Sequence, residues 1–453
     1  NANKGEQSSN KFTNNVFNIV VIICLVLSAI GAIFTPQIVK MFAVGFEGET
    51  LSLAIYYTRV MILGLAFLGM SYIMMAYLQV KENFIIPGFM SVPYNILIII
   101  SIIVSVKISP YLLPWGTLIG LSLQFLFQLP FAIKKGYRYK LYIDVKDEHL
   151  KRMLWLIAPV LIGVAVNQIN TIVDRTIAST LVEGSISALN YATKLNQFVM
   201  GMFIVSISSV VYPMLSKLST ENNKEKFNKS IITSVNTVTL LVIPISIGAI
   251  ILANPIVKLL FQRGEFDARA TQMTAVALIF YSIGMIGYGL RDILGKVFYS
   301  LQDTRTPMIN GVISIVVNII FNLILINFIG HMGLALATSI SALVKLGLMF
   351  RKLKERIADF GQDLILKAFR KVMIASTVMG VVVCLMNSGI NHLSIINSKV
   401  YVLGLFLVIL IGALLYAFMI MKMNIEEVKI ILDKVTYKIK NKNVEAEDIS
   451  QGI

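Results

Sequence analysis

Amide and charged side chains gather on single faces of segments that are otherwise apolar. In VNQINTIVDRTIAS (166–179), the polar residues fall within roughly 140° of arc on a helix of 3.6 residues per turn: Asn167, Asn170, Thr171, Asp174 and Arg175. An ionisable group inside a membrane is unfavourable unless it faces water or a partner. This stripe is therefore predicted to face a cavity or another helix. A self-neutralising Asp174–Arg175 pair that ties two helices together is the alternative.

Two later segments show the same pattern. In SISALNYATKLNQFVMG (185–201), one side carries Ser187, Asn190, Tyr191, Lys194 and Gln197. In the segment 268–298, one side carries Tyr281, Tyr288, Arg291, Asp292 and Lys296. In this last segment, a simple Arg291–Asp292 pair near the membrane surface is an equal alternative.

The cavity defined by these stripes has a cationic excess, because Arg175 and Lys194 outnumber Asp174. Fixed cations in a low-dielectric cleft favour an anionic substrate, and arginine suits phosphate oxygens best. The candidate substrate-binding residues are Asn167, Asn170, Asp174, Arg175, Tyr191, Lys194, Arg291 and Asp292.

Neutral oxygen ligands gather on a second pair of segments. Asn318 and Asn322 are four residues apart and share one helix face, which Thr338 of the following segment can join. With a carboxylate such as Asp174 they form a candidate sodium site, although ordinary hydrogen bonds between helices explain Asn and Thr equally well. The remaining cations inside apolar segments, Arg59 and Lys345, are interpreted as snorkelling side chains near helix ends.

The elements that position these residues are membrane-spanning helices. The chain has 453 residues, of which 57% are hydrophobic and 14% charged, whereas a soluble domain is about one quarter charged. Apolar runs of roughly 20 residues recur throughout, which predicts an all-α polytopic membrane protein. We expect twelve spans: 13–34, 51–78, 85–106, 111–133, 152–180, 186–214, 230–252, 268–298, 307–328, 332–350, 367–388 and 399–421.

The net charge of +16 is a topology signal. The loop 134–152 and the segment 351–371 carry most of the cations and are predicted to be cytoplasmic, as are both ends of the chain. Cations spread along short loops do not indicate nucleic-acid binding. Motifs of enzyme active sites are not found, and Cys24 and Cys384 offer neither a disulfide framework nor metal spacing. We therefore expect a protein that is not an enzyme.

Two stretches far apart in the chain resemble one another. LQVKENFIIPGFMSVPYNILI (78–98) matches LQDTRTPMINGVISIVVNIIF (301–321) at an offset of about 223 positions, and TPQIVKMF (35–42) matches NPIVKLLF (254–261). Six predicted spans separate the copies, so both have the same orientation, and substrate sites in such parallel repeats lie between the halves. The first copy lacks counterparts of two helices. We expect these to precede residue 1, which makes the polar opening NANKGEQSSNKF a cytoplasmic loop.

Three segments of the second copy carry a resemblance to a known family. FQRGEFDARATQMTAVALIFYSIGM (261–285), FYSLQDTRTP (298–307) and GHMGLALATSISAL (330–343) resemble signature segments of the MurJ family of lipid II flippases, within the superfamily of multidrug and polysaccharide-lipid exporters. The resemblance implies two pseudo-symmetric helical lobes around a central cavity, plus two extra C-terminal helices. The implied regions are the remainder of the first lobe (1–133, four helices), a cytoplasmic linker (134–151), the second six-helix lobe (152–350), two additional helices that form a lipid-tail groove (351–421) and a cytoplasmic tail (422–453).

The resemblance also implies a function and its partners. Members of the family move the undecaprenyl-pyrophosphate-linked disaccharide-pentapeptide from the inner to the outer leaflet of the bacterial plasma membrane, by alternating access. The implied partners are this substrate and membrane lipids, with no nucleic acid, a monomeric state and no resident cofactor. Transport is expected to couple to Na⁺, H⁺ or the membrane potential.

Two positions depart from the family pattern. Lys194 stands where the family has an arginine, so the charge is kept but the two-pronged donor is lost. The sodium site of some members maps to Asp174, Asn318, Asn322 and Thr338, and Asn322 replaces an acidic residue there. The family's other cavity arginines lie mostly on the two helices expected upstream.

Three other functions stay open. The first is an exporter of another lipid-linked oligosaccharide, or a sporulation-specific relative. The second is a cation-coupled multidrug antiporter, which would have an acidic, aromatic-lined cavity. The third is a non-transporting scaffold that recruits cell-wall enzymes, which would need no charged stripe.

Overall fold

A computed structural model describes residues 2–221, 223–357, 359–393 and 398–429, and every regular element in this part of the chain is helical. Ten helical stretches here are long and apolar enough to cross a membrane. The pair α13 (Ala268–Ile283) and α14 (Met285–Ser300), which is bent by 43°, is apolar enough to count as an eleventh stretch when it is taken as one broken span. The predicted span 152–180 coincides with helix α8 (Glu148–Ala178), which is not one of these stretches, so its crossing of the membrane stays a prediction. The prediction of an all-α polytopic membrane protein is confirmed.

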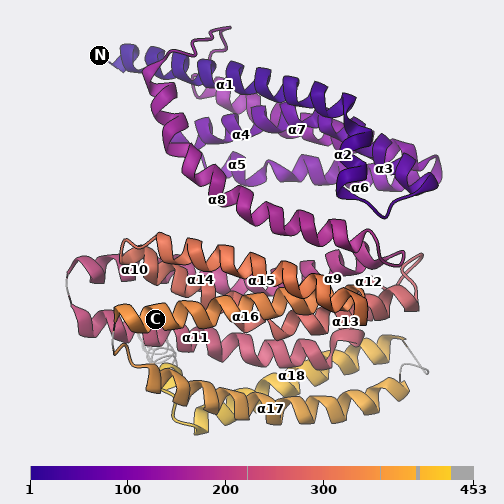
Figure 1. The fold of residues 1–453 in the computed structure, drawn as a ribbon, viewed down its shortest axis with the longest axis vertical. Coiled ribbons are helices and arrows are strands. Elements are labelled where there is room, and N and C mark those ends of the chain that lie inside the picture. The colour runs from indigo at the N-terminus through magenta and orange to yellow at the C-terminus, as the bar shows by residue number, and fades with distance from the viewer. Residues whose placement is uncertain (1, 222, 358, 394–397, 430–453) are drawn as a thin grey trace, which may run out of the picture. The chain divides into compact units, whose positions relative to one another are not determined.

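The chain divides into two compact units at the boundary between Thr180 and Leu181. The expected opening loop is instead part of helix α1. The first unit contains α1 (Ala2–Ile33), α2 (Thr35–Phe42), α3 (Gly48–Met61), η1 (Ile62–Gly64), α4 (Leu65–Val80), α5 (Ile85–Phe89), α6 (Ser91–Lys107), η2 (Pro110–Leu112), α7 (Leu113–Lys134) and α8 (Figure 1).

The second unit begins with a span that contains a π-helical turn, η3 (Met200–Ile204), between α9 (Ser185–Val199) and α10 (Val205–Thr220). Two helices lie between α10 and α13: α11 (Lys224–Ile251) and α12 (Ala253–Phe261). Four helices follow α14: α15 (Arg305–Ile329), α16 (His331–Arg356), α17 (Gln362–Leu393) and α18 (Ser398–Lys422).

Both units pack their helices in the same pairs. In the first unit, α1 packs on α4, α4 on α7, and α7 on both α3 and α6. In the second unit, α11 packs on α14, α14 on α16, and α16 on both α13 and α15 (Figure 1). The short helices α2 and α12, which carry the matching segments TPQIVKMF and NPIVKLLF, pack on α3 and α13 respectively. The internal repeat is therefore present in the packing as well as in the sequence.

The turn after α4 shows how the repeat is aligned. Glu82 takes a left-handed backbone conformation with φ of 58°, which reverses the chain at the helix end. Asn83 follows, and its side-chain oxygen accepts a hydrogen bond from the backbone N–H of Ile86 at 3.3 Å. Pro87 lies four residues after Asn83, inside the short helix α5.

The turn after α14 has the same construction. Gln302 has φ of 58°, Asp303 accepts a hydrogen bond from the backbone N–H of Thr306 at 2.9 Å, and Pro307 follows. Equivalent residues are therefore 220 positions apart (82 and 302, 83 and 303), so the predicted offset of about 223 is wrong at this turn. A shift of three residues is close to one helical turn, so it keeps nearly the same face and preserves an apolar pattern.

The segment between α7 and α8 is an extended strap, residues 135–147, that lies along α1. Three asparagines of α1 form hydrogen bonds with its backbone: Asn14 with Arg138, Asn15 with Asp144, and Asn18 with Lys140 and Tyr142. All three asparagines are buried. The strap, together with contacts of α8 with α1 and α2, joins α8 to the first unit. The predicted residue boundaries of the two lobes and of the linker stay predictions.

Tyrosines complete the contact between the strap and α1. The hydroxyl of the buried Tyr137 donates to the side-chain oxygen of Asn14 at 3.0 Å, and Tyr139 donates to Asn18 at 3.0 Å. Burial, together with the nearby Tyr139 and Tyr77, raises the pKa of Tyr137 to about 12. Tyr137 therefore stays protonated and remains a hydrogen-bond donor at neutral pH.

The break between α13 and α14 is fixed by close packing on α16. A Cβ at Gly284 would lie 2.6 Å from the Cα of Ser339, so a larger residue does not fit without a shift. The hydroxyl of Ser339 donates to the carbonyl of Phe280 at 2.6 Å, beside the bend. Small residues and interhelical hydrogen bonds of this kind hold helices together in lipid, where burial from water is not the driving force.

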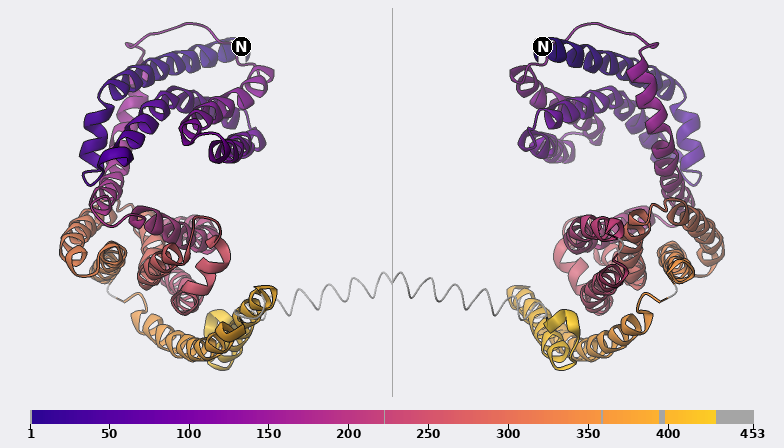
Figure 2. Two further views of the ribbon diagram at one scale, coloured as in Figure 1. Left: turned by 90° about the vertical axis from the view of Figure 1, so that its right-hand side faces the viewer. Right: turned by 90° about the vertical axis from the view of Figure 1, so that its left-hand side faces the viewer.

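Helices α17 and α18 form an outer layer on the second unit, against α11 (Figure 2). Tyr416 of α18 donates to the carbonyl of Leu240 at 2.7 Å, and Asn236 of α11 donates to the buried carboxylate of Glu427 at 2.8 Å. The predicted lipid-tail groove between these helices stays a prediction. Most of the predicted cytoplasmic tail, 430–453, lies outside the described residues.

Candidate functional site

Helix α9 presents its polar stripe on the exposed side. Ala188, Ala192 and Asn196 are buried on the opposite side, which packs on α13, and Asn196 donates to the carbonyl of Tyr281 at 3.3 Å. The predicted stripe forms one exposed face: Ser187, Asn190, Tyr191, Lys194 and Gln197. The ammonium group of Lys194 is thus available to a ligand in this unit.

An aromatic cluster supports the part of this face around Tyr191. The ring of Tyr191 lies 4.7 Å from that of Phe261 and 5.2 Å from that of Phe266, measured between centroids. Phe261 ends α12, and Phe266 lies in the turn that leads to α13. These contacts fix the orientation of Tyr191 while leaving part of its ring exposed.

On α8, the predicted polar stripe lies in the first unit. Asn170 donates to the carboxylate of Asp174 at 3.5 Å, Asp174 is half-buried, and Arg175 is exposed. The end of α8 is anchored because the hydroxyl of Ser179 accepts a hydrogen bond from the backbone N–H of Gly45 at 3.1 Å. The side chain of Asn167 lies outside the described residues. Arg175 and Lys194 belong to different units, so their shared cavity stays a prediction.

The polar stripe of α14 is half-buried, and its charged residues have separate neighbours. The carboxylate of Asp292 accepts a hydrogen bond from Ser208 of α10. The guanidinium of Arg291 lies 4.6 Å from the ring centroid of Tyr288, and Lys296 lies 5.7 Å from that of Tyr212. Among the described residues, no ion pair joins Arg291 to Asp292, so the simple pair is not formed. Sequence reasoning missed Ser208, because a serine on an apolar helix gives no signal of its partner.

The neutral residues predicted for sodium come together between α15 and α16. Asn322 donates to the side-chain oxygen of Asn318 at 2.9 Å, and Asn318 donates to the hydroxyl of Thr338 at 3.3 Å. Thr338 in turn donates to the carbonyl of Leu334 at 2.7 Å. This chain of bonds already uses the oxygens of Asn318 and Thr338. Asp174, the predicted carboxylate ligand, lies in the first unit, so sodium coordination stays a prediction.

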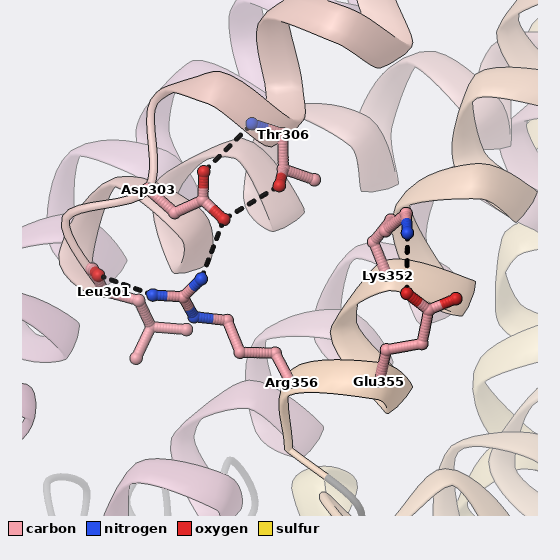
Figure 3. A network of polar contacts seen from close by, with 6 residues as sticks. All are labelled: Leu301, Asp303, Thr306, Lys352, Glu355 and Arg356. Carbon is pink, nitrogen blue, oxygen red and sulfur yellow. Dashed lines mark hydrogen bonds and ion pairs between the residues drawn. The ribbon is translucent and has the colours of Figure 1, made fainter.

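The turn that carries FYSLQDTRTP is held by a polar network (Figure 3). The carboxylate of Asp303 accepts hydrogen bonds from the backbone N–H and hydroxyl of Thr306 and lies 3.1 Å from the guanidinium of Arg356. Arg356 also donates to the carbonyl of Leu301 at 3.4 Å. These bonds tie the α14–α15 turn to the end of α16, which gives the motif a structural role.

Comparisons with known proteins agree with one family. The family model described as "Lipid II flippase MurJ" matches residues 1–412. A probable lipid II flippase MurJ of Vibrio cholerae is 39% identical over 52% of this chain and 45% of its own length. The lipid II flippase MurJ of Burkholderia cenocepacia is 30% identical over 73% of this chain and 66% of its own length. The chain spans 45% and 60% of the first two curated relatives it matches, those of V. cholerae and Haemophilus influenzae.

Solved structures agree with the sequence comparison. A lipid II flippase MurJ in an inward closed conformation has a TM-score of 0.77 and 29% identity, over 91% of this chain and 83% of that one. An inward-facing multidrug transporter of the MATE family has a TM-score of 0.61 at 13% identity, over 80% of this chain and 84% of that one, which shows a shared fold. Because the family model covers most of the sequence, the chain belongs to the MurJ family of lipid II flippases.

Proposed function

We propose that this protein is a flippase that moves lipid II from the inner to the outer leaflet of the plasma membrane, and that it is not an enzyme. The observation that carries this proposal is the family match over residues 1–412. The repeated helix packing supports it, because transporters with parallel repeats place substrate between their halves. Both chain ends are proposed to be cytoplasmic, and the protein is proposed to act as a monomer among membrane lipids.

The pyrophosphate of the substrate supplies the anionic centre for binding. Lys194, exposed on α9, and Arg175, exposed on α8, are the proposed donors to its oxygens. Asp174 would limit the strength of binding and is a candidate to take a coupling cation. Alternating access would expose this face first to the cytoplasm and then to the outside, while α17 and α18 would hold the polyprenyl tail.

Coupling to Na⁺, H⁺ or the membrane potential supplies the driving force in this proposal, without a resident cofactor. Asn318, Asn322 and Thr338 supply neutral oxygens for Na⁺, and Asp174 is the proposed carboxylate. Because Asn322 stands where some family members have an acid, weak dependence on sodium is the expected behaviour.

Complementation tests the function. The gene is expressed in a bacterium depleted of its own lipid II flippase, and survival and accumulation of lipid II in the inner leaflet are scored. Rescue with normal inner-leaflet lipid II supports the proposal. Failure to rescue by a protein that is inserted at normal levels would favour an exporter of a different lipid-linked oligosaccharide.

A further inference from the structure

Lys345 is a cation inside a spanning helix that has no anionic partner among the described residues. It lies in α16 at the fifteenth of 26 positions and is half-buried. No hydrogen bond or ion pair joins its ammonium group to another described residue. An unpaired charge in a membrane span is unfavourable, so such a residue points to a ligand or a pathway.

The ammonium group does not reach the end of the bundle. A Cβ at Gly311 of α15 would lie 3.4 Å from Nζ of Lys345. Gly311 is six residues from Arg305, which begins α15, and that separation is about 9 Å of helix rise. The side chains of a helix lean toward its N-terminus, so Lys345 leans away from the charged residues that start at Arg351. Lys345 therefore lies away from the charged end of α16, and its interpretation as a snorkelling residue stays a prediction.

A second cation lies beside the first. Gly284, at the start of α14, and Gly287 pack against Ser339 and Ala342 of α16, so the two helices run side by side in the same direction. Arg291, four residues after Gly287, is therefore level with Lys345, three residues after Ala342. The carboxylate next to Arg291, that of Asp292, accepts a hydrogen bond from Ser208 of α10 rather than pairing with either cation. Among the residues that the structure describes, no ion pair joins either cation to a carboxylate, so an anion bound beside them would be stabilised.

We propose that Arg291 and Lys345 form a binding site for phosphate oxygens between α14, α15 and α16. The ligand is the pyrophosphate group of a polyprenyl-linked substrate, held at a point on its path that is distinct from Lys194. This inference rests on the proposed flippase function. Gly311 leaves room beside Lys345, because any side chain there would fill the space next to the ammonium group. Arginine provides a forked donor and lysine a point charge, a combination suited to two phosphate groups.

Binding of farnesyl pyrophosphate to the purified full-length protein tests the site. We expect Lys345→Gln and Arg291→Gln each to weaken binding by about tenfold, which corresponds to about 1.4 kcal/mol. Lys345→Arg should stay within about twofold of the parent protein. Lys258→Gln is the matched control, because it removes the same charge elsewhere in the same unit. The ammonium group of Lys258 lies 5.2 Å from the ring centroid of Tyr401. Phosphatidylglycerol is added as a competitor, and competition at equal concentration would assign the site to bilayer phosphate and overturn the proposal.

A second pair of variants separates charge from volume. Gly311→Asp places a carboxylate next to Lys345, whereas Gly311→Asn places a neutral group of the same size there. We expect the Asp variant to bind about tenfold more weakly than the Asn variant. If Gly311→Asp and Lys345→Gln bind like the parent while the parent complements a flippase-depleted strain, this site is wrong and the flippase function stands. If the parent neither binds farnesyl pyrophosphate nor complements, the proposed function itself fails.

Discussion

Lys194 carries the anion-binding role that the exposed face of α9 is proposed to have. Charge reversal by Lys194→Glu should abolish flipping, because the pyrophosphate would then meet an anion on this face. Complementation of a flippase-depleted strain measures the effect, together with protein levels in the membrane. Lys194→Arg is the control and should keep or improve activity, because it restores a forked donor. Full growth with Lys194→Glu would show that this face does not bind the substrate's anion.

Asp303 stabilises the α14–α15 turn in a pH-dependent way. Burial alone would raise the pKa of the Asp303 carboxyl, but hydrogen bonds from Thr306 and the charge of Arg356 lower it below its ordinary value of 3.8. A lowered pKa in the folded state means that the stabilisation is present above pH 3.8 and is lost as pH falls through the folded-state pKa. Asp303→Asn should therefore destabilise the protein at neutral pH by about 1 kcal/mol and remove this acid dependence.

Thermal unfolding in detergent, followed between pH 3 and pH 7, measures this effect. The control is Asp363→Asn, in the first turn of α17, outside the Asp303 network. Equal loss of stability for both variants at every pH would contradict a specific role of the Asp303 network.

Residue spacing predicted part of the candidate site. It identified the stripe on α9 and the association of Asn318, Asn322 and Thr338, because helical periodicity alone decides which side chains share a face. Ser208 as the partner of Asp292 was not predicted, since that contact depends on how α10 packs against α14. The contact of the Lys345 ammonium group with Gly311 was not predicted, because sequence distance from a helix end does not say which way a side chain leans.

At the scale of elements, the asparagines of α1 determine the conformation of the strap 135–147. Asn15 is fully buried and makes a reciprocal pair of bonds with the backbone of Asp144, at 2.8 Å and 2.7 Å. Asn15→Ala should leave both backbone groups without a protein partner, at a cost of about 1–3 kcal/mol. Hydrogen exchange should then accelerate in residues 138–146 while the exchange of α4 and α7 stays unchanged.

Thr13→Ala provides the control on the same helix, because the Thr13 hydroxyl donates only to the carbonyl of Ser9 within α1. Unchanged exchange in the strap of Asn15→Ala would mean that other contacts, such as the Tyr137 hydroxyl, determine its conformation. None of this was predicted from the sequence, since asparagines on a polar helix end are expected to be solvated and only the fold brings residues 10–18 next to 135–147.

The presence of the helices was predicted well, and the alignment of the two copies of the repeat was predicted less well. Apolar runs identified ten helices that are long enough to cross a membrane, because bilayer thickness dictates their length. The break at Gly284, by contrast, depends on the approach of Ser339 from α16. The repeat was detected, but its copies were aligned three residues out at the turns after α4 and α14, because apolar helices supply few distinctive residues. The turn residues Glu82 and Gln302 define the alignment through backbone conformation rather than identity.

At the scale of the whole molecule, the chain is a multi-pass protein of the bacterial plasma membrane built on a repeat. Six predicted spans lie between the turn at Glu82 and the turn at Gln302. An even number of crossings returns the chain to the same side, as a parallel repeat requires. With the predicted orientation of the chain, both turns should face the cytoplasm. The twelve predicted spans place both ends on the same side, and the distribution of Lys and Arg predicts that this side is the cytoplasm.

Cysteine labelling tests this topology directly. Glu82→Cys and Gln302→Cys are made one at a time in a chain whose Cys24 and Cys384 are replaced by serine, and both substituted positions are exposed. A thiol reagent that does not cross membranes should label both in inside-out vesicles and neither in intact cells. Glu265→Cys, at the other end of the α13–α14 span, should show the reverse pattern and serves as the control. Labelling of positions 82 and 302 from opposite sides would establish an inverted repeat, and the proposed arrangement of the substrate site between parallel halves would then have no basis.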